Sequence, residues 1–414
     1  MKEVSMEDII ARENIHEAVL SVERNKGAPG IDGMPVTELR PLLRQHWLSI
    51  KRNLLDGVYI PSPVRRVVIP KDGGGERQLG IPTVLDRMVQ QAISQQLTIV
   101  FDPGFSDHSY GFRPGRSAHG AVLAARAFVH SGKKWMVDLD ISKFFDHVNH
   151  DILMCQVGRK VRDKRILKLI GRYLRAPMLV DGERVKRTEG TPQGGPLSPL
   201  LANIYLDPLD KELERRGLAF ARYADDCNIY LDTEAEAQLV YAEITEWIET
   251  RLKLKINRDK SGTGRPWERK FLGFTITEED KIRPAKKSLE KFKDKVRELW
   301  NALQSLTSNG LRTQWLRYLR GWWGYFRLSD DRMKIYDLDG WIRRHMRKCF
   351  WLRWHCPKGR LRNFKLLGVK PKHWDLSKSS AGSWSMAKNA VMHTALGNKT
   401  LRRYGLLTLA DLPG

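Results

Sequence analysis

The sequence contains few cysteines and no long apolar run. Its four cysteines form no Cys-x-x-Cys pair, which fits a chain kept in a reducing compartment. No stretch approaches the roughly 18 apolar residues that a transmembrane helix needs. The first residues also lack the basic start and apolar core of a secretion signal. These absences exclude a disulfide scaffold and a membrane-spanning protein, and they predict a cytoplasmic location.

Acidic residues are scarce, and one long segment has none. The 414 residues include 72 Lys and Arg but only 48 Asp and Glu, which gives a formal net charge of +24. Positions 342–373 contain no Asp or Glu, and their basic residues alternate with Trp351, Trp354 and Phe364. A solvated helix face usually carries both signs of charge. The unbalanced block therefore favours contact with a nucleic acid.

Two familiar ligand motifs are missing as well. The glycine run from Lys71 to Glu76 does not lead into Gly-x-x-x-x-Gly-Lys-Ser/Thr, so it predicts a tight hairpin tip rather than a P-loop. A cluster at 345–356 contains two His and two Cys, but its spacing is not that of paired zinc ligands. Its aromatic and basic surroundings favour a packed helix that faces RNA.

The sequence does contain two acidic motifs, each beside a predicted strand. Tyr223-Ala224-Asp225-Asp226 lies between two short apolar runs, as the tip of a hairpin would. Residues 135–140 alternate apolar and acidic side chains, which predicts a strand that ends at Asp140. A solvated turn would explain one motif alone. Three carboxylates converging from neighbouring strands instead suit two Mg²⁺ ions, which indicates nucleotidyl transfer.

The ordered motifs resemble the reverse transcriptases of mobile group II introns, also called intron-encoded maturases. The resemblance extends from about Asn14 to the C-terminus. It rests on the segments 25–33, 64–71, 76–82, 110–117, 138–145, 190–199, 223–226, 252–261, 270–274 and 318–327. No His-Asn-Cys cluster of the HNH type is present, so the chain resembles the bacterial class C-like form, which lacks an endonuclease domain.

The resemblance implies an α+β fold in four parts. We expect an N-terminal extension and the start of the fingers over 1–61, and reverse transcriptase fingers and palm of the right-hand polymerase type over 62–276. An all-α thumb or maturase domain over 277–345 and a small basic nucleic-acid-binding region over 346–414 should follow.

Apolar spacing predicts the elements more locally. It indicates a helix over 1–24, a hairpin over 62–82, and mostly helix over 83–200 apart from the strand at 135–140. Further on, residues 288–303 should form an amphipathic helix with Leu289, Phe292, Val296, Leu299 and Leu303 on one face. A second helix should carry Trp315, Leu319, Trp322 and Phe326. Most of the nine tryptophans at or beyond position 300 should pack in the core of this helical part.

The resemblance also implies roles for individual residues. Asp140, Asp225 and Asp226 should be catalytic and hold two Mg²⁺ ions, for which Mn²⁺ can substitute, with the carbonyl of Ile141 as a further ligand. Phe145 should exclude a 2′-hydroxyl, and Phe144 should be its buried neighbour. The expected nucleotide-binding residues are Lys71, Arg77, Ile141, Ser142, Lys143, Phe144, Phe145, Gln193 and Lys260. The expected contacts to template, primer or intron RNA are Arg65, Arg66, Arg113, Arg116, Gly194, Arg343, Arg344, Arg347, Lys348 and Arg353.

The implied function is an RNA-directed DNA polymerase that copies its intron RNA and binds it as a splicing maturase for retrohoming. Its expected partners are the intron RNA, an RNA template with a DNA or RNA primer, target DNA and dNTPs. The expected setting is a cytoplasmic bacterial ribonucleoprotein. The resemblance does not specify the number of subunits. One alternative is a reverse transcriptase of another bacterial system, such as a retron or a diversity-generating element, or a host-domesticated one. Another is an RNA-binding splicing factor with little polymerase activity. The basic, tryptophan-rich segment 284–414 disfavours the other bacterial systems, and the three acids disfavour the splicing factor.

Overall fold

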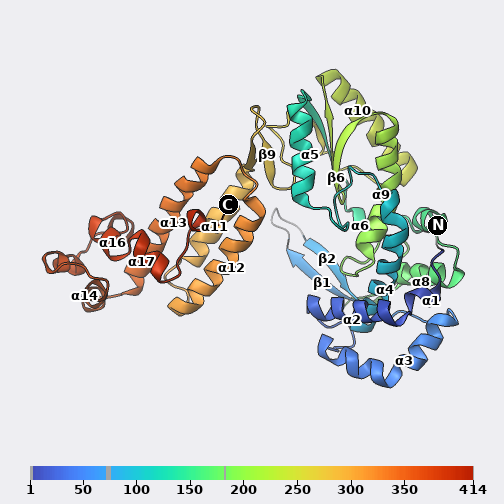
Figure 1. Ribbon diagram of the computed structural model, residues 1–414, viewed down its shortest axis with the longest axis horizontal. Coiled ribbons are helices and arrows are strands. Elements are labelled where there is room, and N and C mark those ends of the chain that lie inside the picture. The colour runs from blue at the N-terminus through green and yellow to red at the C-terminus, as the bar shows by residue number, and fades with distance from the viewer. Residues whose placement is uncertain (1–2, 71–75, 181–182, 414) are drawn as a thin grey trace. The chain divides into compact units, whose positions relative to one another are not determined.

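The computed structural model describes residues 3–70, 76–180 and 183–413, and it divides into two compact units. Unit 1 comprises Met1–Arg265 and unit 2 comprises Pro266–Gly414. Figure 1 shows strands and helices mixed in unit 1, whereas unit 2 is mainly helical. Within the described ranges, no helix is long and apolar enough to cross a membrane.

Unit 1 is built around a four-stranded antiparallel sheet in the order β6-β7-β3-β8. The strands are β6 (Ala219–Tyr223), β7 (Asp226–Leu231), β3 (Trp135–Asp140) and β8 (Gly262–Gly264). β7 is buried at every position from Cys227 to Leu231, so both faces of this strand are covered, and β3 buries Met136, Val137 and Leu139. The helices α5 (Ala118–His130) and α10 (Glu234–Trp247) contact this sheet. The predicted strand at 135–140 and the hairpin around Asp225 are confirmed.

A second sheet in unit 1 has the order β2-β1-β4-β5. Its strands are β1 (Val64–Pro70), β2 (Glu76–Ile81), β4 (Met178–Val180) and β5 (Glu183–Val185). The predicted hairpin over 62–82 is confirmed, although its tip at 71–75, with Lys71, lies outside the described residues. The prediction of mostly helix over 83–200 apart from the strand at 135–140 did not include β4 and β5. β4 and β5 have three residues each, too few for an alternating pattern to show, and β4 is placed by parallel pairing with the distant β1.

Helices surround the two sheets of unit 1. They are α1 (Met6–Ile9), α2 (Arg12–Asn25), α3 (Leu39–Leu55), α4 (Val84–Phe101), α6 (Phe144–His147), α7 (His150–Gly158), α8 (Lys164–Arg175) and α9 (Ser198–Arg215). The single helix expected over 1–24 is two helices. The side chain of Ser5 caps α1 at its start, and the chain leaves helical geometry at Ala11 before α2 begins.

Unit 2 contains a two-stranded pair, β9 (Phe274–Ile276) and β10 (Ile282–Pro284), followed by helices. These are α11 (Lys286–Leu299), α12 (Ser308–Phe326), α13 (Arg332–Arg353), α14 (Pro357–Leu366), α15 (Ser383–Met386), α16 (Ala390–Ala395) and α17 (Asn398–Arg403). Trp300, Trp315 and Trp351 are fully buried in their core. The indole of Trp315 donates a hydrogen bond to the carbonyl of Leu407 at 2.7 Å. The expected core role of these tryptophans is confirmed.

Two sequence expectations for unit 2 need correction. Helix α11 ends at Leu299, and Leu303 is 92 % exposed rather than part of the apolar face. The expected boundary between residues 345 and 346 falls inside α13, and buried residues on both sides of it, Ile342 and Phe364, belong to one core. The rest of the four-part division remains a prediction.

Candidate active site

Asp140 is the last residue of β3, and its backbone is held from both sides. Its N–H donates to the Ser261 hydroxyl at 2.8 Å, and its carbonyl accepts from the N–H of Asn257 at 2.9 Å. In the register of β3 and β7, Asp140 lies opposite Asp226. The strand end is therefore fixed by residues 257–261, which belong to the motif segment 252–261.

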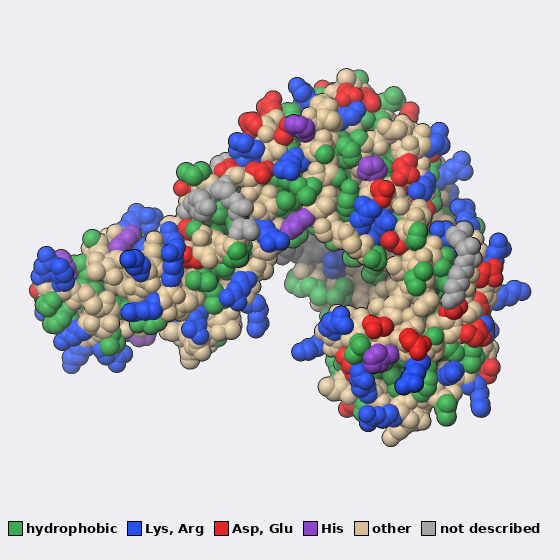
Figure 2. All heavy atoms as spheres, in the orientation of Figure 1, with side chains coloured by type: hydrophobic (Ala, Val, Ile, Leu, Met, Phe, Trp, Pro, Cys, Tyr) green, Lys and Arg blue, Asp and Glu red, His purple; other side chains and the backbone are tan. Residues whose placement is uncertain are grey.

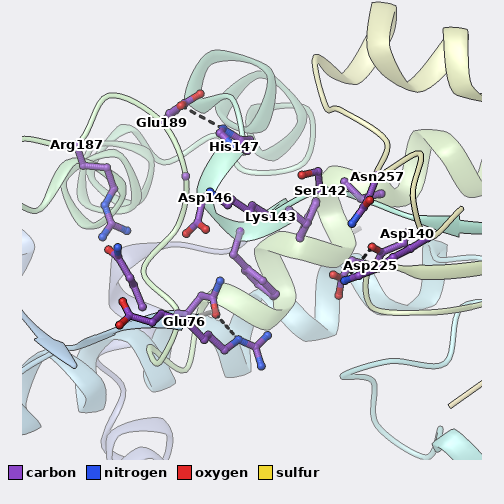
Figure 3. A pocket seen from close by; sticks show the side chains of 18 of the residues that line it. Glu76, Asp140, Ser142, Lys143, Asp146, His147, Arg187, Glu189, Asp225 and Asn257 are labelled. Atoms are coloured by element: carbon purple, nitrogen blue, oxygen red, sulfur yellow. Dashed lines mark hydrogen bonds and ion pairs between the residues drawn. The ribbon is translucent and has the colours of Figure 1, made fainter. Parts of the chain in front are cut away.

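The second acidic motif forms the turn between β6 and β7. Ala224 has a left-handed backbone (φ +57°), which an L-residue adopts only when its surroundings hold it there. The pKa of the neighbouring Asp225 carboxyl is raised, chiefly by burial and further by the negative charge of Asp140. Figure 3 shows the two carboxylates next to each other. A cation between them would relieve both the desolvation and the repulsion, so the pair suits a divalent metal ion.

Asp140 and Asp225 line one cavity of about 620 Å³. Asp226 is exposed and is not among the lining residues, whereas Ile141 is. Across the described ranges, no three His, Cys, Asp or Glu side chains gather closely enough to hold a metal ion by themselves. An ion at Asp140 and Asp225 would therefore complete its shell with water and substrate oxygens, as Mg²⁺ commonly does.

The same cavity collects every expected nucleotide-binding residue that the structure describes. These are Arg77, Ile141, Ser142, Lys143, Phe144, Phe145, Gln193 and Lys260. Arg77 donates from Nε to the Gln193 side-chain oxygen at 2.8 Å, and the Nζ of Lys260 lies 3.6 Å from Asp140 Oδ2. The Lys260 side chain is 70 % exposed, so this ion pair is weak and can yield to a more negative ligand.

The two adjacent phenylalanines have different environments. Phe144 is 1 % exposed and packs in the core, whereas Phe145 is partly exposed and lines the cavity. Their rings meet edge to face with centroids 5.1 Å apart. The expectation that Phe144 is the buried partner is confirmed.

The loop that begins at Gly190 is fastened to the segment that carries Phe145. The N–H of Thr191 donates to the Phe145 carbonyl at 2.7 Å, and the N–H of Gly190 donates to that of Val148 at 2.8 Å. Gly190 has a φ of +79°, and a Cβ atom there would come within 2.6 Å of the Asp146 carbonyl oxygen. Only glycine fits this position, so the close approach of loop and segment depends on it.

Several residues that line the cavity were not expected from the sequence. They are Glu76, Gln78, Asp146, His147, Met178, Arg187, Glu189, Gly190 and Asn257. Figure 3 shows Arg187, His147 and Glu189 away from the two aspartates, and His147 pairs with Glu189 at 3.3 Å. Asn257 lies in a motif segment and could have been found there. Arg187 and Glu189 lie in no helical or strand pattern, so nothing in the sequence marks them.

One arginine expected to contact the template has a structural role instead. The side chain of Arg113 is 5 % exposed, and its guanidinium donates to the Asp102 carboxylate and to the carbonyls of Asp102, Ser106 and Ser109. Arg116 pairs with Asp107, while Arg65 and Arg66 are partly exposed on β1. A Cβ atom added at Gly194 would lie 3.0 Å from the Gly80 carbonyl oxygen, and Gly194 lines a cavity of about 490 Å³ that Phe145 also lines. Contact of these four residues with nucleic acid remains a prediction.

The basic residues of α13 also differ in exposure. Arg347 is 4 % exposed and donates to the Leu396 carbonyl at 3.0 Å, and burial lowers its pKa to about 10. The expected RNA contact of Arg347 is therefore wrong, because its guanidinium is packed in the core. Arg343 bonds to Thr408, and Arg353 to the Leu306 carbonyl. Arg344 and Lys348 are partly exposed, and Figure 2 shows many Lys and Arg side chains on unit 2.

In the described part of the chain, the His and Cys cluster at 345–356 does not come together as a group that could hold a metal ion. His345 lies between the rings of Trp341 and Trp384, Cys349 is buried, and the Cys356 sulfur caps the start of α14. Of the four free cysteines, Cys155 and Cys356 are exposed.

The chain matches two known protein families in succession. Residues 69–276 match the family described as reverse transcriptase (RNA-dependent DNA polymerase), which is half of the chain. Residues 289–366 match the group II intron, maturase-specific domain. The two matches fall on the part of the chain that contains Asp140 and Asp225 and on the helical part of unit 2.

The chain is also similar to individual proteins and to a solved structure. The protein YkfC of Escherichia coli is 33 % identical over 285 residues, which cover 59 % of this chain and 75 % of YkfC. The group II intron-encoded protein LtrA of Lactococcus lactis is 41 % identical over 175 residues, 42 % of this chain and 29 % of LtrA. A solved partial Cas6-RT-Cas1–Cas2 complex shows 25 % identity over 60 % of this chain and 41 % of its own, with a TM-score of 0.36. The chain belongs to the reverse transcriptases and contains a group II intron maturase-specific domain.

Proposed function

We propose that this chain copies group II intron RNA into DNA and also binds that RNA as a splicing maturase for retrohoming. The observation that carries the polymerase part is the cavity in which Asp140 and Asp225 meet eight of the expected nucleotide-binding residues. The maturase part rests on the matched maturase-specific domain and on the basic surface of unit 2. The setting proposed for both activities is a cytoplasmic bacterial ribonucleoprotein with intron RNA, target DNA and dNTPs.

The proposed chemistry assigns distinct tasks to the residues of the cavity. When bound, two Mg²⁺ ions, or Mn²⁺ in their place, would supply activation of a primer 3′-hydroxyl and stabilisation of the leaving pyrophosphate. Asp140 and Asp225 would hold these ions, with the carbonyl of Ile141 in the same cavity as a further ligand, whereas Asp226 does not line the cavity and its expected metal role stays a prediction. Arg77 of β2 and Lys260 of the segment 257–261 bring positive charge to the triphosphate. Gln193, which Arg77 holds through its side-chain oxygen, keeps its amide N–H₂ for the nucleotide.

The partly exposed ring of Phe145 selects the sugar. It is backed by the buried ring of Phe144, so it cannot retreat from a nucleotide that enters the cavity. A flat apolar ring offers no hydrogen-bond partner to a 2′-hydroxyl, and burying that hydroxyl without a partner is costly. The cavity therefore accepts dNTPs in preference to rNTPs.

Primer extension tests the polymerase proposal directly. The purified chain, given an RNA template, an annealed DNA primer, dNTPs and Mg²⁺, should lengthen the primer, and a chelator should stop the reaction. A matched reaction without template controls for untemplated addition. If the protein binds the RNA tightly but never extends the primer, the alternative of a splicing factor with little polymerase activity is correct.

RNA binding by unit 2 should depend on the partly exposed cations of α13, Arg344 and Lys348. Arg344→Gln with Lys348→Gln should reduce the slope of log affinity against log salt by roughly 0.7–0.9 for each phosphate that the protein no longer neutralises. The reason is that each phosphate contact releases a counterion, and these two side chains are partly exposed, unlike Arg347. The measurement is RNA affinity at several salt concentrations.

The control for this experiment removes the same charge from α11. Lys293→Gln with Lys295→Gln takes away two cations that already pair with Glu290 and Glu298. This variant should keep the wild-type slope, because its cations are neutralised within the protein. An unchanged slope in the α13 variant would show that α13 does not contact RNA phosphates.

A further inference from the structure

Arg222 is a buried cation directly beneath the acidic turn. It lies in β6, two residues before Ala224, and is 0 % exposed. Its guanidinium pairs with Asp210 of α9 through two bonds, Nε to Oδ1 at 2.6 Å and a terminal nitrogen to Oδ2 at 2.5 Å. The Asp210 side chain is also 0 % exposed, so the pair is withdrawn from water entirely.

Every N–H of this guanidinium has an acceptor. Besides the two bonds to Asp210, it donates to the carbonyl of Ala224 and to the Ser109 hydroxyl at 2.8 Å each, and to the Asn203 side-chain oxygen at 3.2 Å. A guanidinium has five N–H donors in a fixed planar fork, and all five are used here. The direction of the bond to Ala224 is therefore set by four other contacts.

The turn is held from its other side by the segment 108–111. Gly111 lies so close that a Cβ atom there would come within 2.3 Å of the Ala224 nitrogen. The Gly111 carbonyl accepts from the Asn203 side chain at 2.8 Å, and the backbone of Arg222 bonds to the carbonyl of His108 and to the N–H of Tyr110. The Asn203 side chain therefore links the two groups that contact the turn, because it accepts a hydrogen bond from Arg222 and donates one to the Gly111 carbonyl.

We propose that Arg222, supported by Asp210 and Asn203, is a positioning residue that orients the Asp225 carboxylate toward Asp140. This inference rests on the proposed polymerase function. The peptide group between Ala224 and Asp225 is planar, so a hydrogen bond that fixes the Ala224 carbonyl also fixes the positions of the Asp225 nitrogen and Cα atoms. Ala224 occupies the left-handed region, which the turn would leave if nothing held the carbonyl in place.

The free-energy cost of burying the ion pair between Arg222 and Asp210 supports a role beyond stability. A buried ion pair contributes little net stability, since well-packed apolar residues in its place are often as stable or more so. What apolar residues cannot supply is a hydrogen bond to the Ala224 carbonyl with a defined direction. The function of these buried residues is therefore the directed hydrogen bond from Arg222 to the Ala224 carbonyl, rather than the ion pair between Arg222 and Asp210.

The substitution Arg222→Lys tests whether the positive charge alone is enough or whether the hydrogen bonds of the guanidinium are needed. Lysine keeps the positive charge for Asp210 but has a single ammonium group, which cannot reach all four partners of the planar fork. We expect the variant to bind Mn²⁺ several-fold more weakly in the absence of nucleotide, as measured from the free-Mn²⁺ signal in electron paramagnetic resonance. Its single-turnover rate of primer extension at saturating metal should fall by up to about 10²-fold, the scale of a misplacement near 1 Å.

Arg172→Lys is the matched control. Arg172 also holds two backbone carbonyls, those of Gly57 and Tyr59, but these lie away from the turn. This control should lower the melting temperature without changing Mn²⁺ affinity or the rate per active enzyme. The thermal unfolding curve of Arg222→Lys, recorded in parallel, gives the fraction of folded protein at the assay temperature by which its rate is corrected.

The outcomes separate this inference from the proposed function. A wild-type protein that extends no primer refutes the function, whereas an active wild type with unchanged Mn²⁺ affinity and rate in Arg222→Lys refutes the inference alone. Should Arg222→Lys fail to fold, Asn203→Ala decides, because it keeps the ion pair and removes the link between Arg222 and Gly111. Weaker Mn²⁺ binding in Asn203→Ala supports the positioning role, and unchanged binding overturns it.

Discussion

Asp225→Asn should slow primer extension by at least about 10³-fold, because a metal ion supplies several kcal/mol of transition-state stabilisation and each 1.4 kcal/mol is tenfold in rate. The substitution keeps the shape of the side chain and removes the charge that faces Asp140 in the cavity. Affinity for RNA should not change, since the basic surface of unit 2 is untouched. Single-turnover incorporation of one dNTP and equilibrium RNA binding measure the two effects separately.

The same assay ranks the two acids of the turn, which the sequence alone could not rank. Asp226→Asn should be less severe than Asp225→Asn, because Asp226 is exposed and does not line the cavity. Asp232→Asn is a suitable control, since Asp232 directly follows β7 and pairs with Lys133 instead. Near-normal extension by Asp225→Asn would mean that this cavity is not the catalytic site.

Phe145→Ala should reduce the preference for dNTPs over rNTPs by roughly 10- to 100-fold, the scale at which one apolar pocket contact discriminates between substrates. Its ring lines the cavity, and the other phenyl ring among the described lining residues is that of the buried Phe144. The measurement is the ratio of kcat/KM for dNTP and rNTP on the same primer and template.

Phe144→Ala is the control for that experiment. It should lower the free energy of unfolding by about 3–5 kcal/mol, as truncation of a buried phenylalanine does, while folded enzyme keeps its sugar preference. If Phe145→Ala keeps the wild-type ratio, sugar selection belongs to another part of the cavity.

Local patterns explain why much of unit 1 could be predicted. The alternation over 135–140 marks β3, and the continuous apolar runs around Asp225 mark β6 and β7, whose consecutive residues are buried on both faces; β3 and β7 are adjacent in the sheet. The sequence could not show β4 and β5, because three-residue strands carry too little pattern and depend on pairing with the distant β1. Arg187 and Glu189 enter the cavity for the same reason, since only the folded chain brings them to it.

Charge patterns were less informative than apolar ones. Arg113 and Arg347 look like their exposed neighbours in the sequence, yet the side chain of each is almost inaccessible and bonded to backbone carbonyls. A long side chain with an apolar stem and a forked donor group can serve either a phosphate or a protein carbonyl. Only the position of each residue on its helix or loop decides between the two uses.

The distribution of thiols provides a natural pair of attachment points for spectroscopic labels. Cys155 is exposed in unit 1 and Cys356 is exposed in unit 2, whereas Cys227 and Cys349 are buried. The pKa of Cys356 is lowered, mainly by the backbone N–H of Gly359, so maleimide dyes should react there first. Sequential labelling of the unmodified chain with a donor and an acceptor dye would then measure the separation of the two units as nucleic acid binds.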